Sequence, residues 1–175
     1  QRLLLNMKRI LALTSLIVLL IVIDQITKSA IQANFHYGET YQVIPGFFNL
    51  AYVKNTGAAF GFGQGGPEWF RQVFFLALPV VFCGWIAFLL YKTIKGPLLM
   101  SLAYALIIAG AVGNLIDRFS LGFVVDMFMF YWIKEENHFH VFNVADSCIS
   151  IAAGLLIIDY IKNARANKKL KVQQG

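Results

Sequence analysis

Four long apolar runs dominate the pattern of hydrophobic and polar positions along the chain. A membrane-spanning helix needs about 20 mostly apolar residues, so the pattern predicts spans at about residues 10–31, 69–91, 98–116 and 142–161. Pro79 is expected to kink the second span, because proline removes a backbone donor from a helix interior. The first run resembles a signal peptide, but it continues into Asp24 and Lys28 without a small-residue cleavage site, which favours an uncleaved span.

Two segments between the spans have different patterns. Residues 34–68 begin with the alternation TYQVIPGFFNLAYVKN, which predicts a short hairpin or small sheet, and continue into the glycine-rich NTGAAFGFGQGGP, which can pack closely or move. The link at 118–141 is rich in Phe, Tyr and Trp, a composition suited to the membrane interface. We therefore expect an all-α polytopic membrane protein of four helices with a small β-rich outer subdomain.

Composition agrees with this class. The chain is 58% hydrophobic and only 14% charged, with a mean hydropathy of +0.65, which excludes an ordinary soluble domain. Its length allows one four-helix membrane domain, placed at residues 7–165, followed by a basic tail at 166–175. Met7-Lys8-Arg9 looks like a native start, so residues 1–6 are expected to be a remnant added ahead of it.

The placement of basic residues predicts the orientation. Ten of the 15 Lys and Arg residues fall before the first span, between the second and third, or after the fourth: Arg2, Lys8, Arg9, Lys92, Lys95, Lys162, Arg165, Lys168, Lys169 and Lys171. Cytoplasmic loops carry this excess of positive charge, so both termini are expected in the cytoplasm. The net charge of +6 is thereby explained by topology and lipid headgroups, which weakens a nucleic-acid interpretation.

Ionisable residues inside spans are functional candidates by default. Asp24 and Lys28 are four residues apart and share one helix face. They are interpreted either as a local ion pair that snorkels and fixes helix depth, or as a scaffold that orients a reactive group on another helix. Asn114 and Arg118 in GNLIDR are also four apart, and either cap the third span or hold a carboxylate or a lipid phosphate.

Two further acids are expected at one depth on the outer side. Asp126 lies in the apolar stretch GFVVDMFMF, where an unpartnered carboxylate would cost several kcal/mol. Asp146 lies in FNVADS, where Asn143 can cap the fourth span and place Asp146 in its first turn, so a purely structural capping role is the alternative. Two carboxylates that share a proton can activate water without a metal, as in aspartic proteases.

Cysteine and histidine give weaker signals. Cys83 and Cys148 lie in apolar runs and are interpreted as small core residues, with a Cys148 nucleophile as a minor alternative. His138 and His140 alternate in NHFH, with His36 far upstream, a pattern more typical of interfacial histidines than of a metal site. We expect no metal and no cofactor.

A set of spaced motifs carries a family resemblance. DQITK, VKNTGAAF, GNLIDR, GFVVDMF and FNVADS occur in this order over essentially residues 7–161, and together they resemble lipoprotein signal peptidase, also called signal peptidase II. The resemblance implies a bacterial inner-membrane aspartyl endopeptidase that removes the signal peptide of diacylglyceryl-modified prolipoproteins, on the N-terminal side of the lipidated cysteine. It also implies inhibition by globomycin and no obligate protein partner.

The resemblance assigns the site residues by motif position. The catalytic dyad falls on Asp126 and Asp146. The family's other motif positions, implied to bind substrate or support the site, are Asp24, Lys28, Asn55, Gly57, Asn114, Arg118, Asn143 and Ala145. The site is then expected near the outer face, open to lipid, with the outer sheet and the glycine-rich segment covering it.

Two other function classes stay open from the residues alone. In a proton-coupled transporter, Asp24, Asp126 and Asp146 would form a relay, although all three are expected near one face and do not cross the membrane. In a non-enzymatic assembly or lipid-binding protein the acids would be structural only. A proton flux assay distinguishes the first class, and Asp→Asn variants that lose stability without losing any chemistry would indicate the second.

Overall fold

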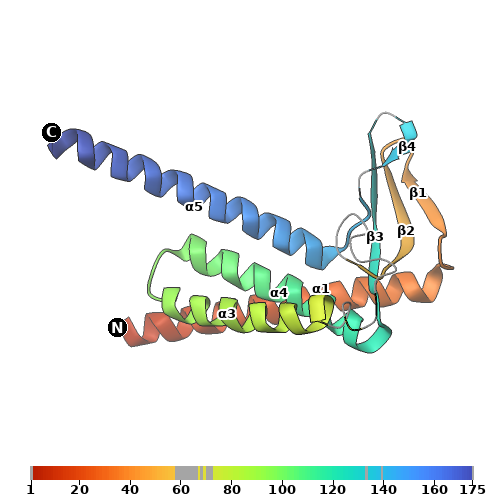
Figure 1. The fold of residues 1–175 in the computed structure, drawn as a ribbon, viewed down its shortest axis with the longest axis horizontal. Helices are drawn as coiled ribbons and strands as arrows, with labels where there is room; N and C mark the ends of the chain where they lie inside the picture. Colours follow the sequence, from red (N-terminus) through yellow and green to blue (C-terminus); the bar gives the residue numbers. More distant parts are fainter. Residues whose placement is uncertain are drawn as a thin grey trace.

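The computed structural model describes residues 2–57, 67, 69, 73–132, 134–138 and 140–174. Long helices lie side by side and a sheet stands at one end of them (Figure 1). The helices are α1 (Arg2–Asn34), α3 (Leu78–Thr93), α4 (Leu98–Leu121) and α5 (Val144–Gln174). The part of the chain that the structure describes holds four helices long and apolar enough to cross a membrane, within Leu4–Asn34, Val73–Thr93, Leu98–Leu121 and Val144–Ala166. The four predicted spans are therefore confirmed.

Pro79, predicted to kink the second span, lies beside a change of helix type. A π-helical turn, η2 (Val73–Ala77), runs directly into α3, and Pro79 occupies the first turn of α3. Proline has no backbone N–H to donate, and the hydrogen-bonding pattern of the helix changes from π to α just before it.

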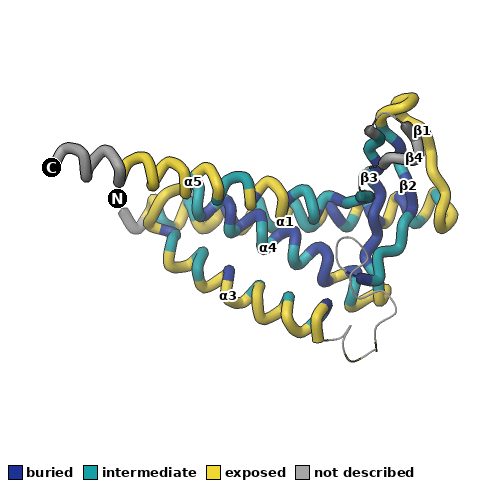
Figure 2. The backbone as a smooth tube through the Cα atoms, turned by 45° about the horizontal axis from the view of Figure 1, so that its top comes forward, coloured by how far each residue is buried: buried dark blue, intermediate teal, exposed yellow. Residues whose placement is uncertain are grey.

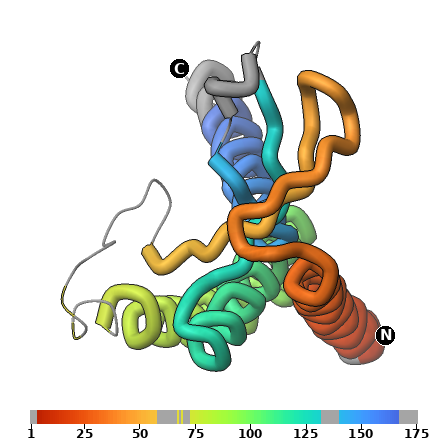
Figure 3. The backbone as a smooth tube through the Cα atoms, turned by 90° about the vertical axis from the view of Figure 1, so that its right-hand side faces the viewer, coloured from red at the N-terminus to blue at the C-terminus, as the bar shows by residue number. Residues whose placement is uncertain are grey.

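Helix α4 is the central helix of the bundle. It packs against α1, α3 and α5, which surround it in the end-on view (Figure 3). In the most apolar stretch of α4, 61% of the residues are buried inside the protein, against 11–17% in the other three spans (Figure 2). Small residues allow this close packing, since the buried positions of α4 include Ala103, Ala105, Ala109, Gly110 and Gly113.

Among the described residues, four antiparallel strands form the sheet, in the order β1-β2-β3-β4: β1 (Thr40–Ile44), β2 (Phe48–Asn55), β3 (Val124–Trp132) and β4 (Lys134–His138). The predicted hairpin is β1–β2. Strands β3 and β4 come from the link that was expected only to lie at the membrane interface, so that expectation was incomplete. The physical reason is that β3 is covered on both faces at Val124–Met127, which removes the alternation by which strands are recognised.

Two connections hold the sheet to the helices. Gly122, at φ 79°, ends α4 in the left-handed conformation that glycine adopts without strain, and the chain turns there into β3. Further on, Phe128 forms a β-bridge with Phe142, just before α5 begins. These connections fix β3 between the end of α4 and the start of α5.

Both ends of the described chain lie at the same end of the bundle (Figure 1). Helix α1 starts and helix α5 finishes at the end of the bundle opposite the sheet (Figure 1).

Candidate active site

Asp126 is a buried carboxyl group in the middle of the sheet. It lies on β3 opposite Val53 of β2, and its side chain is 1% exposed. Its Oδ1 accepts a hydrogen bond from Asn143 Nδ2 at 2.7 Å, and its Oδ2 accepts one from Asn55 Nδ2 at 3.0 Å. Two amide groups therefore partner the carboxyl that would be costly to bury alone.

Asp146 lies in the first turn of α5, as expected. The backbone N–H of Asp146 donates to Asn143 Oδ1 at 2.9 Å, and the backbone N–H of Asn143 donates to Asp146 Oδ2 at 3.3 Å, a reciprocal cap at the helix start. Asn114 Nδ2 on α4 donates to Asp146 Oδ1 at 2.8 Å.

Asn143 contacts both aspartates. Its side-chain amide binds Asp126 while its backbone binds Asp146, so the two acids, from a strand and a helix, meet around one residue. Burial, followed by the negative charge of Asp146, raises the pKa of Asp126 from 3.8 to about 7, although hydrogen bonds from Asn55 and Asn143 oppose the shift. Asp126 thus holds a proton close to neutral pH.

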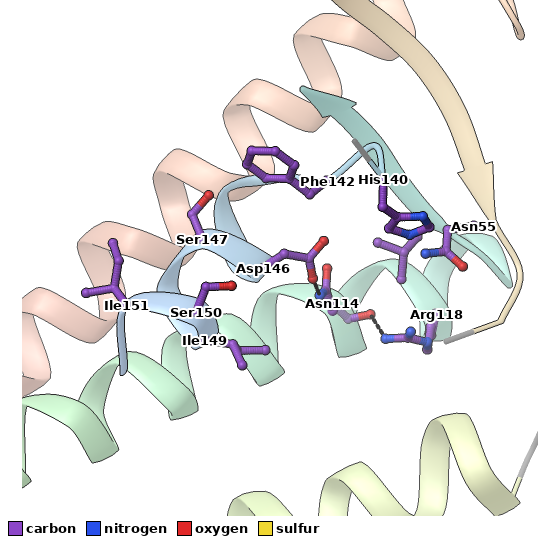
Figure 4. A pocket seen from close by; sticks show the side chains of 11 residues that line it. Asn55, Asn114, Arg118, His140, Phe142, Asp146, Ser147, Ile149, Ser150 and Ile151 are labelled. Atoms are coloured by element: carbon purple, nitrogen blue, oxygen red, sulfur yellow. Dashed lines mark hydrogen bonds between the residues drawn. The ribbon is translucent and has the colours of Figure 1, made fainter. Parts of the chain in front are cut away.

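A cavity of about 590 Å³ adjoins this pair of acids (Figure 4). Asp146 points into it, whereas Asp126 is reached through Asn55, which lines the cavity and donates to it. The full lining is Asn55, Asn114, Arg118, Val124, His140, Phe142, Asp146, Ser147, Ile149, Ser150 and Ile151. The cavity therefore combines polar side chains around Asp146 with a stretch of α5 that contributes both serine and isoleucine side chains.

Asp24 and Lys28 form the expected ion pair, with Lys28 Nζ 2.8 Å from Asp24 Oδ2. The snorkelling interpretation was wrong, because Lys28 is 2% exposed and Asp24 is 1% exposed. Lys28 instead reaches two residues of α4, contacting Asp117 Oδ2 at 3.1 Å and Asn114 Oδ1 at 3.0 Å. Asp24 Oδ1 accepts the backbone N–H of Ala145 at 2.9 Å. The pair thus supports groups on other helices.

Arg118 and Gly57 meet at the edge of the cavity. Arg118 Nη2 donates to Gly57 O at 3.3 Å and Arg118 Nη1 donates to Asn114 O at 3.4 Å, so these contacts of the guanidinium are backbone carbonyls rather than the carboxylates considered above (Figure 4). The backbone N–H of Gly57 donates to Asn55 Oδ1 at 3.1 Å. The Arg118 side chain also lies over the ring of Phe75, with 5.7 Å to the centroid.

Comparison with known proteins decides the family. A sequence model described as "Signal peptidase (SPase) II" matches residues 16–162. The chain belongs to the signal peptidase II family. It is 44% identical over 159 residues to a lipoprotein signal peptidase of Shewanella loihica, covering 91% of each chain. It is 45% identical over 150 residues to one of Actinobacillus succinogenes, covering 85% of this chain and 90% of the relative.

Solved structures have the same fold. A bacterial membrane enzyme solved by the in meso method at 2.3 Å aligns with a TM-score of 0.75 at 32% identity, covering 87% of this chain and 89% of that chain. A second, at 1.9 Å, aligns with a TM-score of 0.72 at 32% identity, covering 86% of this chain and 93% of that chain.

The structure adds residues that sequence reasoning had not assigned to the site. Asp117 and Gln25 belong to the same buried polar cluster as Asp24, and Gln25 Nε2 donates to Asp117 Oδ1 at 2.9 Å. The only available signal was their place inside the motifs DQITK and GNLIDR. His140, expected at the interface, lines the cavity.

Three other expectations have plain outcomes. Cys148 packs with Ala103, Leu106 and Ala152 in an apolar cluster, as a core residue. The side chain of His138 and the glycine-rich segment from Ala58 to Gly66 lie outside the described residues.

Proposed function

We propose that this chain removes the signal peptide from diacylglyceryl-modified prolipoproteins, cutting on the N-terminal side of the lipidated cysteine, with Asp126 and Asp146 as the catalytic dyad. The observation that carries the proposal is the meeting of these two carboxyl groups around Asn143 beside a cavity. The names of the Shewanella and Actinobacillus relatives, both lipoprotein signal peptidases, support the substrate class.

The two acids differ in ways that assign them different tasks. Asp126, with a pKa raised to about 7, keeps a proton that it donates to the oxygen of the scissile carbonyl. Asp146, on the cavity wall, takes a proton from the water that attacks the carbonyl carbon. The tetrahedral intermediate then breaks the C–N bond as the nitrogen accepts a proton from Asp146 and Asp126 regains its own, which restores both acids.

The amide side chains around the dyad hold it in place for this reaction. Asn143 and Asn114 fix Asp146, and Asn55 covers Asp126 on the cavity side. We expect the substrate to displace the Asn55 amide from Asp126. The backbone of the substrate would then accept the hydrogen bond that Asn55 had donated to Asp126. Arg118, at the cavity edge with Gly57, is placed to contact polar groups of the substrate.

The shape of the cavity suits a substrate that arrives from lipid. From Asp146 it extends along α5, past Ser147 and Ser150 to Ile149 and Ile151, within the span Val144–Ala166. A signal peptide with a lipid-bearing cysteine would enter along this membrane-spanning part of α5. We place the protein in the bacterial inner membrane, with both termini cytoplasmic and the dyad near the periplasmic face. Globomycin-like inhibitors would compete for the same cavity.

Cleavage by the purified protein tests this function. Wild type should convert a diacylglyceryl-modified prolipoprotein to the shorter product on a gel, in the presence of a chelator. Asp126→Asn and Asp146→Asn should each fold and lose at least about 10³-fold in kcat, because each removes a proton-transfer group. Asp159→Asn serves as a matched control, since Asp159 accepts a hydrogen bond from Asn163 in the middle of α5, about four helical turns beyond Asp146. A folded dyad variant that cuts at the wild-type rate would refute the dyad.

A further inference from the structure

Two buried carboxylates outside the dyad bind the backbone beside it in the same manner. Asp24 Oδ1 on α1 accepts the N–H of Ala145 at 2.9 Å, and Asp117 Oδ2 on α4 accepts the N–H of Val125 at 2.9 Å. Each carboxylate therefore accepts a hydrogen bond from the residue that immediately precedes one of the two aspartates, Asp146 or Asp126. Asp24 is 1% exposed and Asp117 is 2% exposed, so neither bond competes with bulk water.

One lysine joins these two acceptors. Lys28 Nζ lies 2.8 Å from Asp24 Oδ2 and 3.1 Å from Asp117 Oδ2. Gln25 Nε2 links the same pair, at 3.2 Å from Asp24 Oδ2 and 2.9 Å from Asp117 Oδ1. Hydrogen bonds to charged groups are stronger than neutral ones. The contacts of Lys28 and Gln25 with Asp117 therefore hold α1 firmly against α4.

A third branch leads directly to a dyad carboxylate. Lys28 Nζ also donates to Asn114 Oδ1 at 3.0 Å, and Asn114 Nδ2 donates to Asp146 Oδ1 at 2.8 Å. The same lysine is thus connected to the dyad through Asp24, through Asp117 and through Asn114. The productive geometry of an active site has to be held within about 0.5 Å. Two neighbouring carboxyl groups repel each other when both are ionised, so their separation has to be fixed by other groups.

We infer that Asp24, Lys28 and Asp117 form one positioning unit that sets the separation of Asp126 and Asp146. Asp117 is the positioning residue for the strand that carries Asp126, and Asp24 is its counterpart for the helix that carries Asp146. The unit touches the residue before each aspartate and leaves the cavity to other side chains. The inference rests on the proposed function, since that function gives the two aspartates their reaction.

Asp117→Asn tests the unit through kinetics. The substitution keeps the shape of the side chain but removes the charge that binds Lys28. We expect kcat to fall roughly 10- to 100-fold with KM within about twofold of wild type, because the dyad is misplaced while the cavity is intact. Asp159→Asn should leave both constants unchanged. An Asp117→Asn protein that folds and keeps the wild-type kcat overturns the inference, and so does one that fails to fold, since the unit would then serve stability alone.

Amide hydrogen exchange tests the same inference without using activity. Asp117→Asn should speed exchange at the Val125 amide more than at Ala145, and Asp24→Asn should do the reverse, since each weakens one bond. Lys28→Gln should speed both. If wild type cuts no prolipoprotein, the proposed function fails while this readout still applies to the geometry. Equal exchange at Val125 and Ala145 in all three variants would show that the bonds are not separate arms of one unit.

Discussion

The environment of Asp126 differs strongly from that of an ordinary solvated carboxyl group. Water is excluded from it, and its hydrogen-bond donors are the uncharged amides of Asn55 and Asn143. Amides lower the pKa of a carboxyl less than a cation in contact would, so burial and the charge of Asp146 prevail. Lys28, a buried cation of this network, makes its ion-pair contacts with Asp24 and Asp117. Its charge therefore only partly offsets the raised pKa of Asp126.

The pKa of Asp126 predicts how stability depends on pH. The folded state holds this proton up to a pH of about 7, whereas the unfolded chain releases it near 3.8. The protonated form therefore stabilises the fold fully below pH 3.8, and this contribution is lost as pH rises through 7. Between about pH 5 and 8 the thermal midpoint of wild type should fall relative to that of Asp126→Asn, by the equivalent of about 1–4 kcal/mol. Parallel curves for the two proteins would contradict the shift.

Single residues also show where sequence reasoning ends. The pairing of Asp24 with Lys28 follows from a spacing of four within one helix, and it is present. Their burial, and their link to Asp117, depend on how α4 lies beside α1, which no local pattern encodes. The Asn143 cap was predictable for the same reason as the ion pair, whereas its second bond, to Asp126, was not.

Among the elements, α4 packs closely against its neighbours because it carries glycine at the points of contact. A Cβ atom at Gly113 would lie 2.7 Å from Asp24 Oδ2 and 3.2 Å from Ala145 Cβ. Asp24 cannot give way easily, since it bonds both Lys28 and Ala145. Helix contact and site geometry therefore depend on the same position.

Gly113→Ala should separate α4 from α1 and α5. We expect a loss of about 1–3 kcal/mol in stability, as for other overpacked sites, and a fall in kcat of at least about tenfold. Gly154→Ala on α5 is the matched control, because a Cβ there meets nothing within 4 Å, and it should be neutral or stabilise by up to about 1 kcal/mol. Thermal unfolding and cleavage rates measure both variants, and equal behaviour of the two would show that the close approach is unimportant.

The elements divide sharply by how well the sequence predicts them. Spans are read from length and hydropathy, and hairpin β1–β2 from its turn and alternation. Strand β3 was not predicted. Val125 is 0% exposed, Asp126 1% and Met127 1%, so neither face of the strand meets water at these residues and the polar–apolar alternation is missing. The element that carries one dyad aspartate was thus the one with the least periodic signal.

At the scale of the whole molecule, the two ends of the bundle have opposite characters. The sheet, the cavity and the dyad share one end, and both ends of the described chain lie at the other (Figure 1). Between them, α1, α3 and α5 expose large apolar side chains to the surroundings, as a lipid-facing surface requires (Figure 2). The basic residues of the α3–α4 turn and of the last turns of α5 lie at the end away from the sheet.

This polarity predicts which end a membrane-impermeant thiol reagent reaches. With Cys83 and Cys148 replaced, Tyr41→Cys in β1 should react in intact spheroplasts, since Tyr41 is 63% exposed at the sheet end. Asn163→Cys, exposed on α5, should react only after the membrane is permeabilised. Reactivity of Asn163→Cys alone in intact spheroplasts would place the sheet in the cytoplasm and invert the proposed orientation.

The ion pair within α1 has a consequence for how the protein is made. Asp24 and Lys28 lie one turn apart, so α1 can leave the translocon as a helix whose charges already compensate each other. Asp117 then arrives with a later helix as a second acid for the same lysine, and Ala145 arrives with the last. If the proposed function holds, the contacts around Asp126 and Asp146 are complete only when synthesis has delivered α5, so we expect a nascent chain to have no peptidase activity.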